Sequence, residues 1–174
     1  AGWTTADAEP LIPQTALMGM SKPMVFDGVD DYVTFDSSLS LTADFTLSAW
    51  IYPNALDTRI FLGDAAGDDW IRFNSATVMI IEIAGNQIVL THGLTFTTGE
   101  LQHLAIVRAS NVITVYRNAT AGGTTGTRSG TFAPDYIGKK ASTDYFNGNI
   151  NEVSIWNDDL TLAEVQELFN DGVP

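Results

Sequence analysis

The chain of 174 residues is the size of one domain and is long enough to bury about two thirds of its unfolded surface. It contains no cysteine, so disulfides and thiolate chemistry are excluded and stability must come from a hydrophobic core. Eight basic against twenty-one acidic residues give a net charge of −13, which repels phosphate backbones and argues against a nucleic-acid partner. No apolar run reaches the roughly 18 residues of a membrane span, so we expect no membrane insertion.

Residues 1–23 show no sustained hydrophobic period. Pro10 and Pro13 oppose a helix or a central strand in this segment. We therefore expect an N-terminal arm or edge segment over residues 1–23 and a folded domain over residues 24–174. The apolar residues of the arm, among them Trp3, require a cover, which either the same domain or a neighbouring subunit can supply.

From residue 24 onward, short β-prone runs alternate with turns rich in Gly, Asp, Asn, Ser and Thr. The predicted strands cover residues 24–26, 32–35, 45–52, 59–62, 70–73, 78–83, 87–90, 104–108, 112–117, 136–138 and 150–156. In strand 45–52 the odd-numbered residues are all apolar, and the even-numbered ones are two hydroxyl residues and two aromatics. The run 119–130 has no large apolar residue and predicts a loop. The pattern predicts an all-β sandwich of two antiparallel sheets.

One short helix is predicted near the C-terminus. Thr161 suits the N-cap, Glu164 completes a capping box, and Leu160 can contact Val165 as a hydrophobic staple. The apolar stripe of this helix consists of Leu162, Val165, Leu168 and Phe169. Gly172 is expected to take the left-handed conformation that ends the helix.

Seven sequence segments carry a further signal when they are taken together in order. They are FDGVDDYVTF (26–35), FTLSAWIYP (45–53), LGD (62–64), HLAIVR (103–108), ITVYRN (113–118), IGK (137–139) and FNGNINEVSIWNDDLTLAEVQEL (146–168). Their order and spacing resemble the laminin G-like jelly roll, which belongs to the concanavalin A-like lectin and glucanase group and is related to the pentraxins. The resemblance implies an all-β fold, a two-sheet antiparallel jelly-roll sandwich with one short C-terminal helix.

The sequence does not carry the catalytic pattern of the glucanases in this group. Those enzymes hydrolyse glycosidic bonds with carboxylates that alternate along one strand. Here the paired acids are adjacent and belong in turns, whereas Glu82 and Glu152 are single acids on strands. His92 and His103 fit structural positions, and no serine nucleophile elbow or phosphate-binding glycine loop is present. We therefore expect a binding protein and not an enzyme.

The resemblance also implies a possible calcium site, because pentraxin-like relatives hold calcium on loops at the concave face. The first acidic position of these relatives corresponds to the loop GDAAGDDW, which offers the oxygen ligands Asp64, Asp68 and Asp69. At the second position Lys139 and Lys140 stand where acids are expected, and only Asp144 is nearby. Two alternatives stay open for the first loop: it holds a single calcium ion, or its acids are solvated turn residues without an ion. Glu152 on the last strand is a further candidate ligand.

Sugar recognition requires aromatic rings against the sugar faces and polar groups at their edges. Trp70 and Tyr145 lie at strand or loop ends beside acidic or amide residues, so we predict that they bind ligand together with Asp144. Trp50 and Trp156 lie within strands and are expected in the core.

Two classes of function follow from these observations. The first, which the resemblance favours, is a non-catalytic module for carbohydrate recognition or adhesion, with calcium as a candidate cofactor and a glycan or cell-surface polysaccharide as partner. The second is a structural or decoration protein on a bacteriophage virion, joined to neighbouring subunits through residues 1–23. The expected location is extracellular or on a virion surface. An exposed aromatic cluster beside an acidic loop on the concave sheet would favour the first class.

Overall fold

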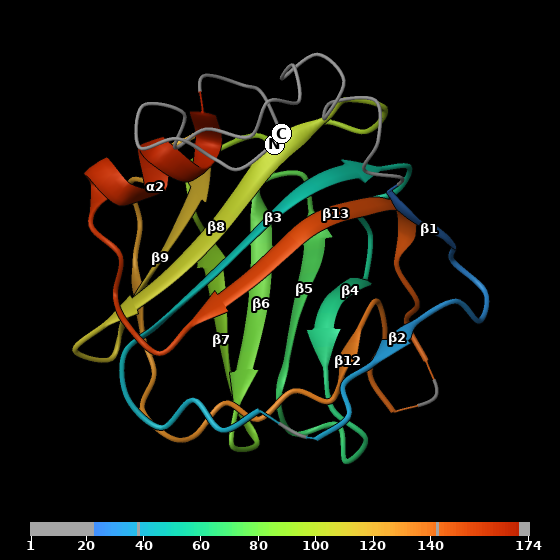
Figure 1. The fold of residues 1–174 in the computed structure, drawn as a ribbon, viewed down its shortest axis with the longest axis horizontal. Coiled ribbons are helices and arrows are strands. Elements are labelled where there is room, and N and C mark those ends of the chain that lie inside the picture. The colour runs from blue at the N-terminus through green and yellow to red at the C-terminus, as the bar shows by residue number, and fades with distance from the viewer. Residues whose placement is uncertain (1–22, 38, 142, 171–174) are drawn as a thin grey trace, which may run out of the picture.

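The computed structural model describes residues 23–37, 39–141 and 143–170, which form two antiparallel sheets packed face to face (Figure 1). Across sheet A the strands are β1 (Met24–Asp27), β13 (Asn147–Trp156), β3 (Phe45–Pro53), β8 (Gln102–Ala109), β9 (Val112–Arg117) and β10 (Thr120–Ala121), and β11 (Gly126–Thr127) also pairs with β9. Across sheet B they are β2 (Val33–Thr34), β12 (Tyr136–Ile137), β4 (Arg59–Gly63), β5 (Trp70–Ser75), β6 (Val78–Ile83) and β7 (Asn86–Thr91). The predicted all-β jelly-roll sandwich is confirmed.

The core lies between the two sheets and follows the period-two pattern of the sequence. The odd-numbered residues of β3 are fully buried, and they face apolar side chains from β4, β5, β6 and β7. Two aromatic pairs help to fill this space: Phe45 stacks on Phe132, with ring centroids 5.6 Å apart, and Phe73 contacts Phe96 edge to face at 5.1 Å. The chain therefore obtains its stability from this interface, as the absence of cysteine requires.

The segment 119–130 was predicted to be a loop. This prediction is wrong in part, because the segment contains the short strands β10 and β11. Both pair with β9 through backbone hydrogen bonds, which do not require apolar side chains. At Gly126 an added Cβ would lie 2.6 Å from Leu90 Cδ2 and 2.8 Å from Ile88 Cδ1. The glycine thus allows a close approach that hydrophobic periodicity does not report.

Helix α2 (Leu162–Phe169) begins as predicted but ends earlier. The Thr161 hydroxyl accepts a hydrogen bond from Glu164 N, and the Glu164 carboxylate accepts one from Thr161 N at 2.8 Å, so the capping box is confirmed. The left-handed residue at the end is Asn170, with φ 46° and ψ 48°, whereas Gly172 lies outside the described residues. The apolar stripe is narrower than predicted, since Leu162 is 48% exposed.

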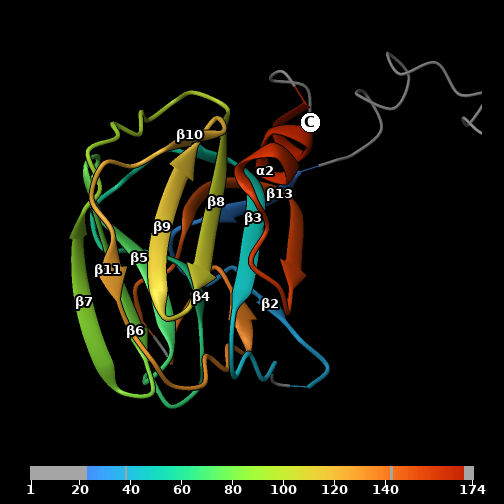
Figure 2. The same ribbon diagram turned by 90° about the vertical axis from the view of Figure 1, so that its left-hand side faces the viewer.

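Helix α2 packs on the outer face of sheet A (Figure 2). Val165 is buried against Ala105 and Val107 of β8, and Phe169 stacks on Trp50 of β3 with ring centroids 5.7 Å apart. The prediction that Trp50 is buried is confirmed, but its cover is the helix and not the opposite sheet. Trp156 is half-buried, so the core prediction is met only in part.

Residues 1–22 lie outside the described residues, so the N-terminal arm, the domain boundary at residue 23 and subunit joining through the arm stay predictions. Among the described helices none is long and apolar enough to cross a membrane.

Candidate functional site

The outer face of sheet B brings together two of the three predicted ligand-binding residues, Trp70 and Asp144, and the backbone of the third, Tyr145, lies next to Asp144. Arg72 follows Trp70 by two positions on β5, and its guanidinium carbon lies 5.1 Å from the centroid of the Trp70 ring. The Nη1 atom of Arg72 lies 3.8 Å from Asp144 Oδ2. Arg59 Nη1 donates a hydrogen bond of 3.2 Å to the carbonyl oxygen of Tyr145. Two arginines from adjacent strands therefore link Trp70, Asp144 and the Tyr145 backbone.

The loop that carries Asp144 is held against β4 by its backbone. Ile60 N donates to Asp144 O at 3.1 Å, and Ala141 N donates to Asp64 O at 2.8 Å. The loop passes so close to β4 that an added Cβ at Gly63 would lie 2.5 Å from Lys139 O. A residue larger than glycine at position 63 would therefore displace the loop and, with it, Asp144.

Two cross-strand rows extend this face away from β4. In the first, Arg72 pairs in register with Ile80, and Ile80 pairs with Val89, whose side chain is 64% exposed. In the second, Trp70 pairs with Glu82, and Glu82 pairs with Gln87. Gln87 Nε2 donates to Glu82 Oε2 at 2.6 Å, so the Glu82 carboxylate is engaged within the row. The face thus combines an apolar row with a polar one.

The ring of Trp70, which was predicted to bind ligand, is covered by other side chains. The residue is 1% exposed, its Nε1 donates to Gly67 O at 3.1 Å, and Lys140 Nζ lies 4.1 Å from the ring centroid. In this arrangement the ring offers no free face to a sugar, because Lys140, 70 positions along the chain, lies over it. The contribution of Trp70 to ligand binding stays a prediction.

Sequence reasoning missed the cations of this site. Lys139 Nζ lies 3.3 Å from the ring centroid of Tyr32 and 4.3 Å from that of Tyr136, and the two tyrosine rings contact each other edge to face at 5.6 Å. The two lysines were interpreted only as missing calcium ligands. One usable signal was present, because Arg72 must share a face with Trp70 at a spacing of two in a strand.

The predicted calcium loop uses its carboxylates to hold its own backbone. Asp64 Oδ1 accepts hydrogen bonds from the backbone nitrogens of residues 67, 68 and 69 at 2.8, 3.0 and 3.1 Å. Asp69 Oδ1 accepts a bond of 2.8 Å from Ala84 N, which ties the loop to the turn after β6. Burial raises the pKa of Asp69, and the nearby carboxylates of Asp64 and Asp68 add to the rise, whereas the bond from Ala84 opposes it. This donor set does not fit a ready calcium site.

Glu152, the fourth predicted metal ligand, lies elsewhere. It is exposed on β13 of sheet A, at a shift in strand register, with φ 50°. Among the described residues, one group of three acids has carboxylate oxygens within 4.8 Å of one another: Asp27, Asp30 and Asp31. All three are exposed, and Asp27 Oδ1 accepts a bond of 2.7 Å from Val29 N within the loop. Exposed acidic groups of this kind are common in loops without an ion.

The two histidines are buried, in agreement with their predicted structural positions. His103 lies beneath α2, its Nε2 is 2.7 Å from Ser48 Oγ, and its ring lies 5.4 Å from that of Trp50. Burial lowers the pKa of His103 to about 4 and also lowers the pKa of His92. Both rings are thus neutral near pH 7, and they belong to the packed structure and not to the exposed face.

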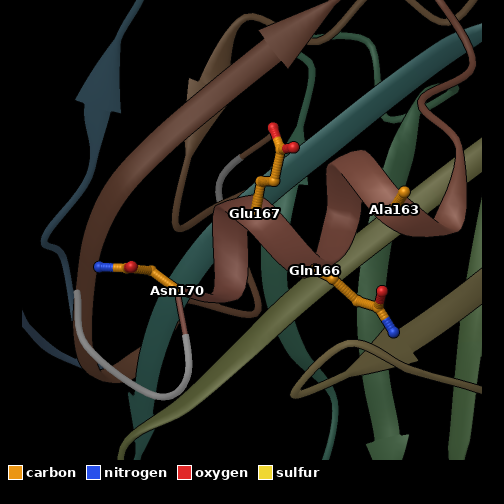
Figure 3. A pocket seen from close by; sticks show the side chains of 4 residues that line it. All are labelled: Ala163, Gln166, Glu167 and Asn170. Carbon is orange, nitrogen blue, oxygen red and sulfur yellow. The ribbon is translucent and has the colours of Figure 1, made fainter.

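A hollow beside α2 is lined by the four residues drawn in Figure 3: Ala163, Gln166, Glu167 and Asn170. Their side chains come from a single helix, and Gln166 and Glu167 point to opposite sides of it (Figure 3). The hollow therefore does not bring polar groups from several elements to one point, as the outer face of sheet B does.

Comparisons with solved structures identify similar folds. The SAP-like heptameric pentraxin of Limulus polyphemus is 14% identical, with a TM-score of 0.67 over 83% of this chain and 80% of that one. Domain 4 of AbnA, a GH43 extracellular arabinanase from Geobacillus stearothermophilus, in complex with arabinotriose, is 19% identical, with a TM-score of 0.61 over 86% and 89%. The CBM40 of Ruminococcus gnavus IT-sialidase, bound to α2,3-sialyllactose, is 10% identical, with a TM-score of 0.55 over 80% and 97%. At these identities the likeness establishes the fold.

The sequence itself gives the family. No curated protein matches the chain. A laminin G family model, described as the concanavalin A-like lectin/glucanases superfamily, matches residues 27–166, which is most of the chain. This agrees with the resemblance carried by the seven segments and with the sandwich described above. The chain therefore belongs to the concanavalin A-like lectin/glucanases superfamily.

Proposed function

We propose that the chain is a non-catalytic, extracellular carbohydrate-binding module that holds its ligand on the outer face of sheet B, around Arg72. The observation that carries this proposal is the convergence of Trp70 and Asp144 on Arg72. Helix α2 packs on the outer face of sheet A, and in the described part of the chain it leaves this face uncovered (Figure 2).

The chemistry of the face suits a sugar. Pyranose and furanose rings present hydroxyl groups at their edges and C–H groups on their faces, so a binding surface needs paired polar groups beside an apolar floor. Val89, which is 64% exposed and packs beside the buried Ile80, supplies apolar surface. Polar groups beside it come from Arg72, Asn74, Gln87 and Asp144.

The state of the acids on this face supports binding without hydrolysis. Glycosidases place two carboxyl groups on either side of the scissile bond, about 5–10 Å apart, one to donate a proton and one as nucleophile or base. Here the Glu82 carboxylate is engaged by Gln87, and Asp144 lies beside the Arg72 guanidinium. Both carboxylates are thus engaged by side chains of the face and do not form a free catalytic pair.

The comparisons supply further support. Two of the similar structures contain a saccharide, arabinotriose in the arabinanase domain and sialyllactose in the CBM40. Calcium is not part of this proposal, because the carboxylates of Asp64 and Asp69 are engaged by backbone N–H groups.

The test is a microarray of neutral and acidic oligosaccharides, followed by calorimetric titration of the strongest binder. The Arg72→Ala variant should lose at least about tenfold in affinity, because a charged hydrogen-bonding group is removed. Arg117→Ala is the matched control, since Arg117 is a similarly exposed arginine that lies on sheet A and pairs with Glu100 at 3.8 Å. Equal affinity in wild type and Arg72→Ala, or no binding to any saccharide, would contradict the proposal.

A further inference from the structure

The basic residues of this acidic chain are concentrated at one place. The sequence has eight of them against twenty-one acids. Three lie on the outer face of sheet B: Arg72, Lys139 and Lys140. Arg59 lies at the start of β4 in register with Phe73, whose side chain belongs to the core. Three of the seven basic residues in the described part of the chain thus share one face of a molecule whose net charge is −13. The face therefore differs in its local charge from the remainder of the molecule.

The other described cations are engaged away from this cluster. Arg108 is fully buried and donates to the carbonyl oxygens of Leu41 and Gly130 at 3.1 and 2.7 Å. Arg117 pairs with Glu100 on sheet A, and Arg128 Nη2 donates to the carbonyl oxygen of Gln87. These three arginines have defined roles within the fold.

The two lysines at the site are held by aromatic rings and not by acids. Lys140 lies over Trp70, and Lys139 lies between Tyr32 and Tyr136. In the described part of the chain neither forms an ion pair with a carboxylate. A ring face attracts a cation without neutralising its charge. Lys139 is only 8% exposed, whereas Lys140 is partly exposed, so the charge of Lys140 is the one that a ligand can reach.

Arg72 is also incompletely satisfied. Its Nη1 is 3.8 Å from Asp144 Oδ2, and its Nη2 donates to Asn74 Oδ1 at 3.5 Å, which are long contacts for charged groups. Its Nε is enclosed and has no hydrogen-bond acceptor among the described atoms. A guanidinium has five N–H donors in a planar fork that matches a carboxylate, so an anionic group would satisfy it better than the present contacts do.

The acids of the same face limit what kind of anion fits. Glu82 lies opposite Trp70, and Asp144 lies beside Arg72. A polyanion would meet these carboxylates at close range and would be repelled. A molecule with one acidic group among hydroxyls avoids this repulsion, because its hydroxyls can donate hydrogen bonds to Glu82 and Asp144.

We infer that the module recognises an acidic saccharide, whose carboxylate or sulfate group contacts Lys140 Nζ and the Arg72 guanidinium, the two cations packed on the Trp70 ring. This inference rests on the proposed function and specifies its ligand class. The contact with the acidic group adds two charge-assisted interactions that a neutral sugar cannot form. Affinity should therefore depend on the ligand charge and fall as salt is added.

The experiment is a microarray in which each sialylated, uronate-containing or sulfated oligosaccharide is printed beside its neutral parent. We expect signal on acidic members, at least about tenfold over the neutral parents, and a loss of similar size in Lys140→Gln. Arg117→Gln should bind as wild type does. Two sets of matched ligands distinguish a carboxylate from a sulfate as the recognised group. One set compares uronates before and after reduction of their carboxylates to alcohols, and the other compares sulfated saccharides with their desulfated forms.

Each result decides a different point. Equal binding of acidic members and neutral parents, or unchanged binding by a folded Lys140→Gln variant, would overturn this inference and leave the proposed function intact. Absence of binding to every member, neutral and acidic, would overturn both. Binding of acidic members that survives 0.5 M NaCl unchanged would also contradict the assigned contact. Thermal unfolding of Lys140→Gln checks that the variant is folded, and Lys140→Arg should retain binding.

Discussion

The two outer faces of the sandwich have the same strand geometry but different covers. Sheet A is covered by α2, so aromatic and polar side chains that point outward from β3 and β8 are buried there, among them Trp50, Ser48 and His103. Sheet B has no helix over it in the described part of the chain. Its outer face carries the cations Arg72, Lys139 and Lys140 together with exposed Val89 and amide groups. A helix over one face turns that face into a second core, and the uncovered face is left for recognition.

The largest expected effect comes from opening the covered face. Trp50→Ala removes a buried indole from beneath Phe169 and should destabilise the protein by about 3–5 kcal/mol, measured by urea unfolding. Saccharide affinity of the folded variant should be unchanged, because Trp50 faces away from sheet B. A loss of affinity at full folding would show that the two faces are not independent.

The pH dependence of stability should also originate at the covered face. His103 has a folded pKa of about 4, below the usual unfolded value of about 6.5, so the neutral form is the one that the fold favours. Stability is therefore fully present above about pH 6.5 and is lost as the pH falls towards 4, by about 3 kcal/mol in total. His92, whose pKa is also lowered, adds a loss in the same direction.

This dependence can be measured by urea unfolding at several values between pH 7.5 and 5.0, above the range in which most carboxylates titrate. His103→Gln keeps a polar group beside Ser48 but removes the titration, so its stability should fall less steeply with decreasing pH. An identical slope in His103→Gln and wild type would contradict the assignment to His103.

The capping box tests how much the cover depends on local signals. Thr161→Ala removes the hydroxyl that accepts from Glu164 N and should cost about 1 kcal/mol in the free energy of unfolding. Thr161→Ser is the control, because its hydroxyl can form the same bond. Equal losses in both variants would mean that the lost methyl group, and not the cap, causes the effect.

The smallest effect is expected at the acidic loop beside the uncovered face. Thermal unfolding in excess calcium and in excess chelator should give the same midpoint, because the carboxylates of Asp64 and Asp69 already accept backbone hydrogen bonds. A rise of several degrees in calcium, abolished by the double variant Asp68→Asn/Asp69→Asn, would contradict this expectation and restore the loop as a calcium site.

Local sequence patterns predicted much of the fold correctly. The alternation in residues 45–52 gave both faces of β3, and Thr161 with Glu164 gave the start of α2. The end of α2 was predicted incorrectly. Asn170, two residues before Gly172, adopts the left-handed conformation that ends the helix, and asparagine tolerates this conformation. Strands β10 and β11 were also missed, because backbone pairing at Gly126 leaves no hydrophobic pattern.

The candidate site was predicted in part. Trp70, Asp144 and Tyr145 were selected from their neighbours in sequence. The structure places Trp70 and Asp144 beside Arg72, whereas the Tyr145 carbonyl accepts a hydrogen bond from Arg59. The contact of Lys140 with the Trp70 ring was not predictable from the sequence. It depends on the pairing of β12 with β4, which brings two distant segments together. The engagement of Asp64 by three backbone nitrogens likewise depends on how the loop closes.

The sequence by itself determined the all-β class, most strand positions, the capped helix and the acidic character of the chain, because these depend on side-chain periods and on contacts within a few residues. The tertiary structure decided which outward face is covered and where the cations gather. Those features depend on pairs far apart in sequence, such as Ile60 with Asp144 and Ser48 with His103. Strand register sets such pairs, and a shift of one residue would send every side chain to the opposite face.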